Sequence, residues 1–217
     1  MIRHWVIGDV HGCHDALERL LGLLPESDQL VFCGDVVGRG PDVVSTAERV
    51  WGLVCSGRAT WLRGNHEQRL SQDPVLQHAL WPTTPDVAQQ WVERLQALPL
   101  VFQGNGWVAT HAGFDANDCP DLEIREPFWQ TYDGRFGQVV VAHTPGLEVR
   151  RHGQIVLIDT GAVYGGLLTA FCPETDAVVQ VQGEDHTGAG LRAKGMTKQL
   201  HKSQPTLVAE VLNVSPC

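Results

Sequence analysis

The stretch "LRGNHEQRL" (residues 62–70) brings Arg, Asn, His and Glu within five positions, at the end of the apolar run "ATWL". A glycine at this point allows the backbone to turn tightly. One interpretation is a simple turn from a strand into a helix, with Asn65 as the N-cap residue. The other is a functional site at the mouth of a strand. The rest of the chain decides between them.

Other short apolar runs end in polar residues in the same way: "HWVIGDVHG", "QLVFCGDVVGRG", "WVATHAG", "QVVVAHTP" and "IVLIDTG". Each predicts a buried strand with polar side chains at its carboxyl end. Apolar stripes with helical spacing predict helices over residues 17–24, 43–54 and 87–98. The segment "LLTAFCPETDAVVQV" predicts a hairpin around "PETDA". The order of these patterns predicts an α/β (mixed α+β) fold, in which mixed sheets pack together and helices lie outside.

The length of 217 residues fits a single domain over residues 1–217. The strand-end motifs occupy about residues 1–182, and a polar, weakly patterned tail follows over 183–217. A net charge of -9 argues against stable nucleic-acid binding, which needs a basic surface. The sequence indicates neither an export signal nor a membrane span, so we expect a cytoplasmic protein. It contains no indication of oligomeric state.

The six cysteines are scattered without a CxxC pair, so we expect free thiols and neither a disulfide framework nor a zinc site.

The polar residues at the predicted strand ends form one candidate site. In an open sheet the carboxyl ends of the strands meet in one crevice. The residues concerned are Asp9, His11, Asp35, Arg39, Arg63, Asn65, His66, His111 and His143. Two carboxylates, three histidines and an amide among them suit two divalent cations. The spacing of Asp9 and His11 predicts that both face one ion from an extended segment.

The motifs "GDVHG", "GDVVGRG", "RGNHE", "THAG" and "AHTP" resemble, in order and rough spacing, those of the phosphoprotein phosphatase family of calcineurin-like metallophosphoesterases. The resemblance runs from about residue 5 to residue 180. This family includes bacterial Ser/Thr protein phosphatases and symmetrical diadenosine tetraphosphatases. The resemblance implies a metallophosphoesterase fold, a β-sandwich flanked by helices with a dinuclear metal site at the strand ends.

The resemblance also implies a role for each matched residue. Asp9 and His11 would bind one metal ion, Asp35 would bridge both ions, and Asn65, His111 and His143 would bind the second. His66 and Asp35 would be catalytic, while Arg39, Arg63 and Arg125 would bind the substrate phosphate. The two ions would be divalent, with manganese as the first choice and iron, zinc or a mixed pair as alternatives.

These roles agree with known phosphoester chemistry. Two cations can hold a bridging hydroxide for in-line attack on phosphorus. Arginine side chains offer paired hydrogen bonds to phosphoryl oxygens. A basic leaving group needs a proton, which His66 could supply as a general acid.

Gly38 departs from the protein phosphatase pattern, in which an Asp at this position pairs with the catalytic histidine. Its absence resembles the tetraphosphatases, whereas "GNHE" and "IREPFW" resemble the bacterial protein phosphatases. Our first expectation is a Ser/Thr protein phosphatase-like enzyme acting on phosphoproteins or small phosphate monoesters. One alternative is a symmetrical bis(5'-nucleosyl)-tetraphosphatase with a nucleotide substrate, and another is a metal-binding interaction module without catalysis.

Overall fold

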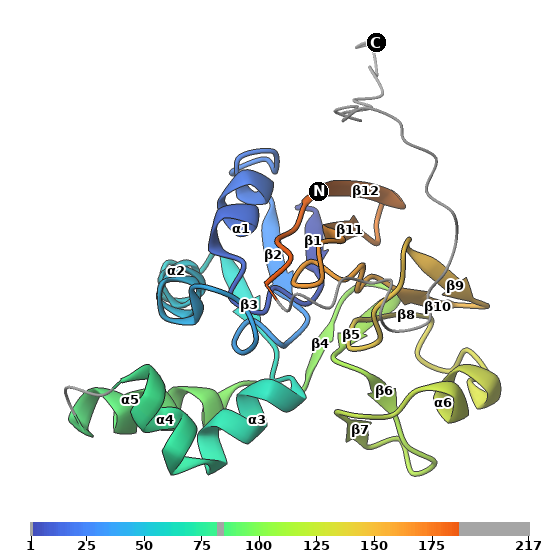
Figure 1. The fold of residues 1–217 in the computed structure, drawn as a ribbon. Helices are drawn as coiled ribbons and strands as arrows, with labels where there is room; N and C mark the ends of the chain where they lie inside the picture. Colours follow the sequence, from blue (N-terminus) through green and yellow to red (C-terminus); the bar gives the residue numbers. More distant parts are fainter. Residues whose placement is uncertain (1, 82–84, 187–217) are drawn as a thin grey trace.

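The computed structural model describes residues 2–81 and 85–186. Two five-stranded sheets form its centre (Figure 1). The first sheet has the order β12 (Ala177–Gln182), β11 (Leu167–Cys172), β1 (His4–Ile7), β2 (Gln29–Phe32), β3 (Ala59–Trp61). The second has the order β4 (Val101–Gln103), β5 (Trp107–Thr110), β8 (Gln138–Val141), β10 (Ile155–Leu157), β9 (Arg150–His152). The remaining strands, β6 (Gly113–Phe114) and β7 (Pro120–Asp121), form a small separate pair.

Both large sheets are mixed, as the sequence predicted. Strands β1, β2 and β3 are parallel in the first sheet, and β5, β8 and β10 are parallel in the second. Antiparallel strands complete each sheet. The parallel arrangement matters for function because it directs the carboxyl ends of neighbouring strands to the same edge.

In the part of the chain that the structure describes, six helices accompany the sheets: α1 (His14–Leu21), α2 (Val43–Cys55), α3 (Asn65–Gln72), α4 (Pro74–Leu80), α5 (Pro85–Ala97) and α6 (Glu126–Thr131). The predicted stripes correspond to α1, α2 and α5. Helix α2 begins where the Asp42 side chain accepts a hydrogen bond from the Ser45 N–H at 3.0 Å. In Figure 1, α1 and α2 lie beside the first sheet, and α6 lies near β6 and β7.

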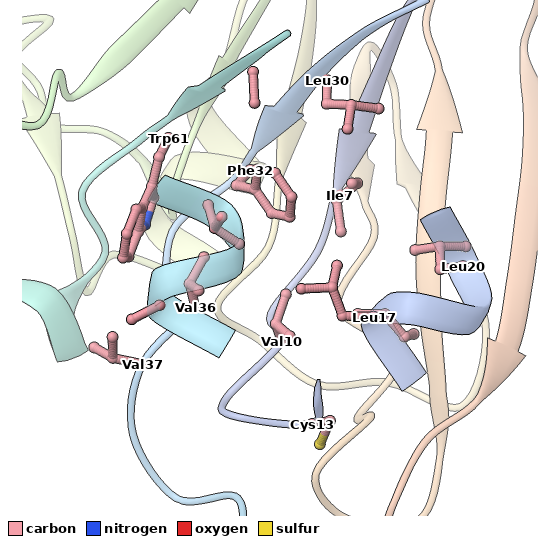
Figure 2. Close-up of a cluster of buried hydrophobic side chains, with 14 of the residues drawn as sticks. Ile7, Val10, Cys13, Leu17, Leu20, Leu30, Phe32, Val36, Val37 and Trp61 are labelled. Atoms are coloured by element: carbon pink, nitrogen blue, oxygen red, sulfur yellow. The ribbon is translucent and has the colours of Figure 1, made fainter. Parts of the chain in front are cut away.

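The central strands, such as β1, β2, β8 and β10, are mostly apolar because both of their faces are buried, whereas the edge strands β9 and β12 carry polar and exposed residues. In β2, Val31 belongs to the cluster shared by the two sheets, whereas Leu30 and Phe32 belong to the cluster under the helices. Figure 2 shows Leu17 and Leu20 of α1 in the cluster under the helices, together with Leu30 and Phe32. This packing holds the parallel strand ends in fixed relation to one another.

The predicted hairpin is confirmed by the antiparallel pairing of β11 with β12. The five described cysteines carry free thiols, as expected: Cys13, Cys33, Cys55, Cys119 and Cys172. Among the helices the structure describes, none has the length and apolar character needed to cross a bilayer. Of the predicted polar tail, residues 187–217 lie outside the described residues, as do residues 82–84 of the loop between α4 and α5.

Candidate active site

The predicted site residues follow the carboxyl ends of five parallel strands drawn from both sheets. Asp9 and His11 follow β1, Asp35 follows β2, Asn65 and His66 follow β3, His111 follows β5, and His143 follows β8. Residues more than 130 positions apart meet here, since the His143 N–H donates to Oδ1 of Asp9 at 3.2 Å. The prediction that the strand ends assemble into one site agrees with this geometry.

The first group of possible metal donors contains His11, Asp35 and His66, each offering one atom within 4.8 Å of the others. Nε2 of His11 also lies 3.5 Å from Oδ2 of Asp9 and 3.6 Å from Oδ2 of Asp35. Nδ1 of His11 lies 3.1 Å from the Val37 carbonyl oxygen. A histidine that donates Nδ1–H to a carbonyl leaves Nε2 free to bind a metal.

One detail of the prediction is wrong: Asp9 and His11 do not lie on one extended segment. His11 has a φ of 49°, in the left-handed region, because the N–H groups of Val10 and His11 both turn to the Asp35 carbonyl oxygen. The two side chains face each other across this turn.

The second group of possible donors contains Asp35, His111 and His143, again within 4.8 Å of one another. Nε2 of His111 lies 3.5 Å from Oδ1 of Asp35 and 3.0 Å from Oδ1 of Asn65. Nδ1 of His111 lies 2.8 Å from the Cys33 carbonyl oxygen, which fixes the ring. Nε2 of His143 is buried and has no hydrogen-bond partner among the described residues, as a nitrogen reserved for a metal would be.

Asp35 is the member common to both groups. Its Oδ2 faces His11, whereas its Oδ1 faces His111 and also accepts the His66 N–H at 2.9 Å. A carboxylate with one oxygen directed to each group has the geometry of a bridge between two ions.

The charges of the site also fit divalent cations. Burial raises the pKa of Asp9 well above its usual range, and it raises the pKa of Asp35 to about 7. Burial lowers the pKa of His11 well below its usual range, that of His111 to about 4 and that of His143 to about 3. Closely spaced buried carboxylates need positive charge, and neutral histidines are the form that binds metals.

Two further buried carboxylates lie beside this set and were missing from the predicted site. Asp159 follows β10 in "IVLIDTG" and is 4% exposed. It raises the pKa of Asp9 and Asp35 by charge repulsion. The strand-end pattern that selected the other residues applies equally to Asp159, and could have found it. Glu67, one turn into α3, is fully buried.

His66 lies against Gly38 and Arg39. Nε of Arg39 lies 3.3 Å from Nε2 of His66. Gly38 has a φ of +92°, and a Cβ added there would lie 2.4 Å from Nδ1 of His66. The absence of a side chain at position 38 is therefore what makes room for the imidazole. Burial and then the Arg39 charge lower the pKa of His66 to about 4.

The structure does not bring all three predicted phosphate-binding arginines to the site. Arg39 is exposed beside His66, and Arg125 lines a groove of about 510 Å³ together with Asn65 and His143. Arg63 is placed differently from the expectation, because its Nη2 donates to the carbonyl oxygens of Gln96 and Leu98, at the end of α5.

A second, larger groove of about 950 Å³ also begins at Asn65. It runs between the α3–α4 segment and residues 115–124. Its lining combines four carboxylates (Asp73, Asp115, Asp121, Glu123) and one arginine (Arg69) with apolar groups (Pro74, Pro120, Leu122, Ile124).

Mixed sheets that direct two groups of Asp, His and Asn donors to one edge are the architecture of a metallophosphoesterase. The sequence profile of the calcineurin-like phosphoesterases matches residues 2–187, and the chain belongs to that family. It is therefore a hydrolase acting on phosphoester or phosphoanhydride bonds. Membership also implies divalent metal ions, which the two donor groups fit.

Curated relatives add names to this family. The asymmetrical bis(5'-nucleosyl)-tetraphosphatase PrpE of Bacillus subtilis is 28% identical over 225 residues, covering 80% of this chain and 92% of the relative. The symmetrical bis(5'-nucleosyl)-tetraphosphatase of Ralstonia nicotianae is 34% identical over 146 residues, covering 58% of this chain and 50% of the relative. A solved structure described as that of a candidate diadenosine tetraphosphatase shares the fold, with a TM-score of 0.67, 24% identity and coverage of 84% of this chain and 94% of that chain.

Proposed function

We propose that this protein hydrolyses a phosphoanhydride bond of dinucleoside tetraphosphates, which the sequence suggested only as an alternative. The contact between Gly38 and His66 carries this proposal. With no side chain at position 38, no carboxylate from that position can support a charged His66, and the Arg39 guanidinium faces the ring instead. A nucleotide leaving group needs far less proton donation than a serine alkoxide, so it suits such a site.

The metal-binding roles that we propose start from the two donor groups, with Asp9 taking the place of His66 in the first. Asp9 and His11 would hold one ion, Asn65, His111 and His143 the other, and Asp35 would lie between them. Bound divalent cations would supply positive charge to the phosphoryl oxygens and activate the attacking water. The protein's part is to fix the donors, which it does through the Val37 and Cys33 carbonyls behind His11 and His111.

We assign substrate phosphate binding to Arg39 and Arg125. Both are exposed side chains at the edge of the donor groups, one beside His66 and the other beside His143. Their guanidinium groups can donate paired hydrogen bonds to phosphoryl oxygens. We do not assign this role to Arg63, whose guanidinium is engaged by helix α5.

The grooves beside the metal-donor groups support an extended substrate. A phosphate chain would be repelled from the larger groove, because its four carboxylates outnumber its one arginine, Arg69. A nucleoside is uncharged, its ribose hydroxyls can donate to carboxylates, and its base can pack on the apolar lining. We therefore place one nucleoside of the substrate in the larger groove.

We infer the bond that is cleaved from the relatives that align over most of their length. These are named asymmetrical bis(5'-nucleosyl)-tetraphosphatases. We expect one nucleoside monophosphate and one nucleoside triphosphate as products. Two nucleoside diphosphates would instead indicate symmetrical cleavage at the same site.

A substrate panel tests the proposal. Manganese-loaded protein would be given diadenosine tetraphosphate, a phosphoserine peptide and p-nitrophenyl phosphate, and nucleotide products would be separated by ion-exchange chromatography. We expect kcat/KM to be highest for the tetraphosphate. A higher kcat/KM for the phosphopeptide would overturn the proposal and favour a protein phosphatase. Bound metal without turnover of any of the three would indicate an interaction module.

A further inference from the structure

The buried carboxylate of Glu67 binds three backbone amides from two separate segments. Its Oε2 accepts the N–H groups of Asp35 at 2.7 Å and Gly64 at 2.8 Å, and its Oε1 accepts the Val37 N–H at 3.1 Å. Glu67 thereby joins the loop after β2 to the turn that begins α3. With three backbone N–H groups on its two oxygens, the Glu67 carboxyl group is held in one position between the two segments.

The loop that Glu67 holds carries backbone strain. Asp35 has a φ of 50°, a left-handed conformation that is costly for a residue other than glycine unless the surroundings enforce it. The N–H groups of Val10 and His11 hold the Asp35 carbonyl from the other side, at 3.2 and 2.8 Å. Asp35 is thus fixed between the turn after β1 and the side chain of Glu67.

The two segments also touch directly. A Cβ added to Gly64 would lie 2.3 Å from Oδ1 of Asp35 and 2.8 Å from Oε2 of Glu67. The residue after Gly64 is Asn65, and its Oδ1 faces the same histidine as Oδ1 of Asp35. Any movement of Asp35 relative to Gly64 would change the distance between donors of the second group.

We infer that Glu67 is a positioning residue, which sets the distance between Asp35 and the Asn65–His66 pair. Glu67 belongs to neither donor group among the described residues, so its effect on metal binding is indirect. The inference rests on the metal-binding roles proposed above and not on the identity of the substrate.

The test is Glu67→Gln, which replaces one carboxylate oxygen by an NH2 group facing backbone N–H donors. We expect faster hydrogen exchange at the amides of Asp35, Val37 and Gly64 in metal-free protein, followed by NMR. We also expect manganese affinity, measured by calorimetry, to fall about 10- to 100-fold, as is typical when residues behind metal ligands are changed.

Glu184→Gln is the matched control. Oε1 of Glu184 accepts the Ala16 N–H in the first turn of α1 at 3.2 Å, so the variant makes the same chemical change at another helix start. We expect manganese affinity to be unchanged in this control. Wild-type exchange and wild-type affinity in a folded Glu67→Gln protein would overturn the inference.

A measurement on the unmodified protein remains decisive if Glu67→Gln does not fold. The amides of Asp35, Val37 and Gly64 should exchange slowly in the native, metal-free protein, and rapid exchange of all three would contradict the inference. None of these measurements involves a substrate. Failure of the tetraphosphatase proposal would therefore leave their outcome unaffected.

Discussion

The imidazole of His66 is neutral at pH 7, since burial and Arg39 lower its pKa to about 4. Its protonated form is present below that value and is lost as the pH rises. We expect the rate on an alkyl phosphate, relative to the rate on diadenosine tetraphosphate, to fall by up to about tenfold per pH unit above the pKa. Taking the ratio cancels every titration that affects both substrates equally.

His66→Asn should remove this dependence. General acid catalysis is worth roughly 10²–10⁴-fold, so the variant should lose much more rate on the alkyl phosphate than on the tetraphosphate. Steady-state rates on both substrates between pH 5 and 8 provide the measurement. Equal losses on both would show that His66 positions groups without donating a proton.

Gly38→Ala should damage the site more than the fold. The new Cβ would lie 2.4 Å from Nδ1 of His66, so the imidazole must move. Gly57→Ala is the matched control, because Gly57 has a φ of +76° and open space around its Cβ position. Both variants should lose about 1 kcal/mol of unfolding free energy through backbone strain. We expect only Gly38→Ala to lose kcat on the tetraphosphate as well. Equal kcat in the two variants would contradict the claim that a side chain at position 38 displaces His66.

Residue types at strand ends were enough to predict which side chains gather at the site. Asp9, Asp35, His111 and His143 were all predicted because each ends an apolar run. Side-chain direction could not be predicted in this way, and Arg63 shows why. Its position after β3 is at the site, but its long side chain reaches the end of a helix that starts 22 residues later.

Arg63 closes the carboxyl end of helix α5, where unpaired carbonyls attract a cation. We expect Arg63→Gln to lower the melting temperature and to leave the KM for the tetraphosphate within about twofold of wild type. Arg125→Gln should raise the KM for the tetraphosphate and leave the melting temperature unchanged, because Arg125 lies in the groove beside His143. Melting curves and steady-state kinetics on both variants separate the two roles. If Arg63→Gln raised the KM without lowering the melting temperature, the prediction that Arg63 binds the substrate phosphate would be restored.

The helices with a continuous apolar stripe were predictable, and those without one were not. Helices α1, α2 and α5 each carry an apolar stripe, which comes from burying one face against the sheets or neighbouring helices. Helix α4 has no buried residue, and α6 has one, Phe128. Without a buried face, a short helix leaves no periodic pattern in the sequence.

The metal-free protein should lose stability as the pH rises from 7 to 8.5. Burial raises the pKa of Asp35 to about 7 and that of Glu67 to about 8. Groups with a raised folded pKa hold more protons in the folded state, so their contribution is full at low pH and is lost as the pH passes the folded values. The site histidines, whose pKa folding lowers, act in the opposite direction only below about pH 6.5.

Manganese should therefore raise the melting temperature more at pH 8.5 than at pH 7. Binding at 100 times the dissociation constant adds about 2.7 kcal/mol per site, or roughly 5 °C or more for a chain of this size. Asp35→Asn should lose most of this shift and all activity, because it removes the shared charge. Asp118→Asn is the control, since Asp118 also has a positive φ, 62°, but lies outside the donor groups. A normal shift in Asp35→Asn would contradict the dinuclear arrangement.

The sandwich as a whole was predictable because its parallel strands are apolar on both faces. The sequence left the substrate class open, and our proposal for it rests on distances of a few ångströms. Gly38 shows this best: its identity was evident from the sequence, but its contact with His66 depends on two loops meeting after residues 32 and 61.

The two donor groups become complete at different times during synthesis of the chain. Asp9, His11, Asp35 and His66 all lie within the first third of the sequence, and their strands form one sheet. The second group needs His111 and His143, which arrive with the other sheet. A nascent chain that has just emerged past α5 holds every donor that we propose for one ion, and only Asp35 and Asn65 of those proposed for the other. Synthesis thus delivers the proposed donors of one ion before those of the other, and the sheet that arrives last completes the second donor group.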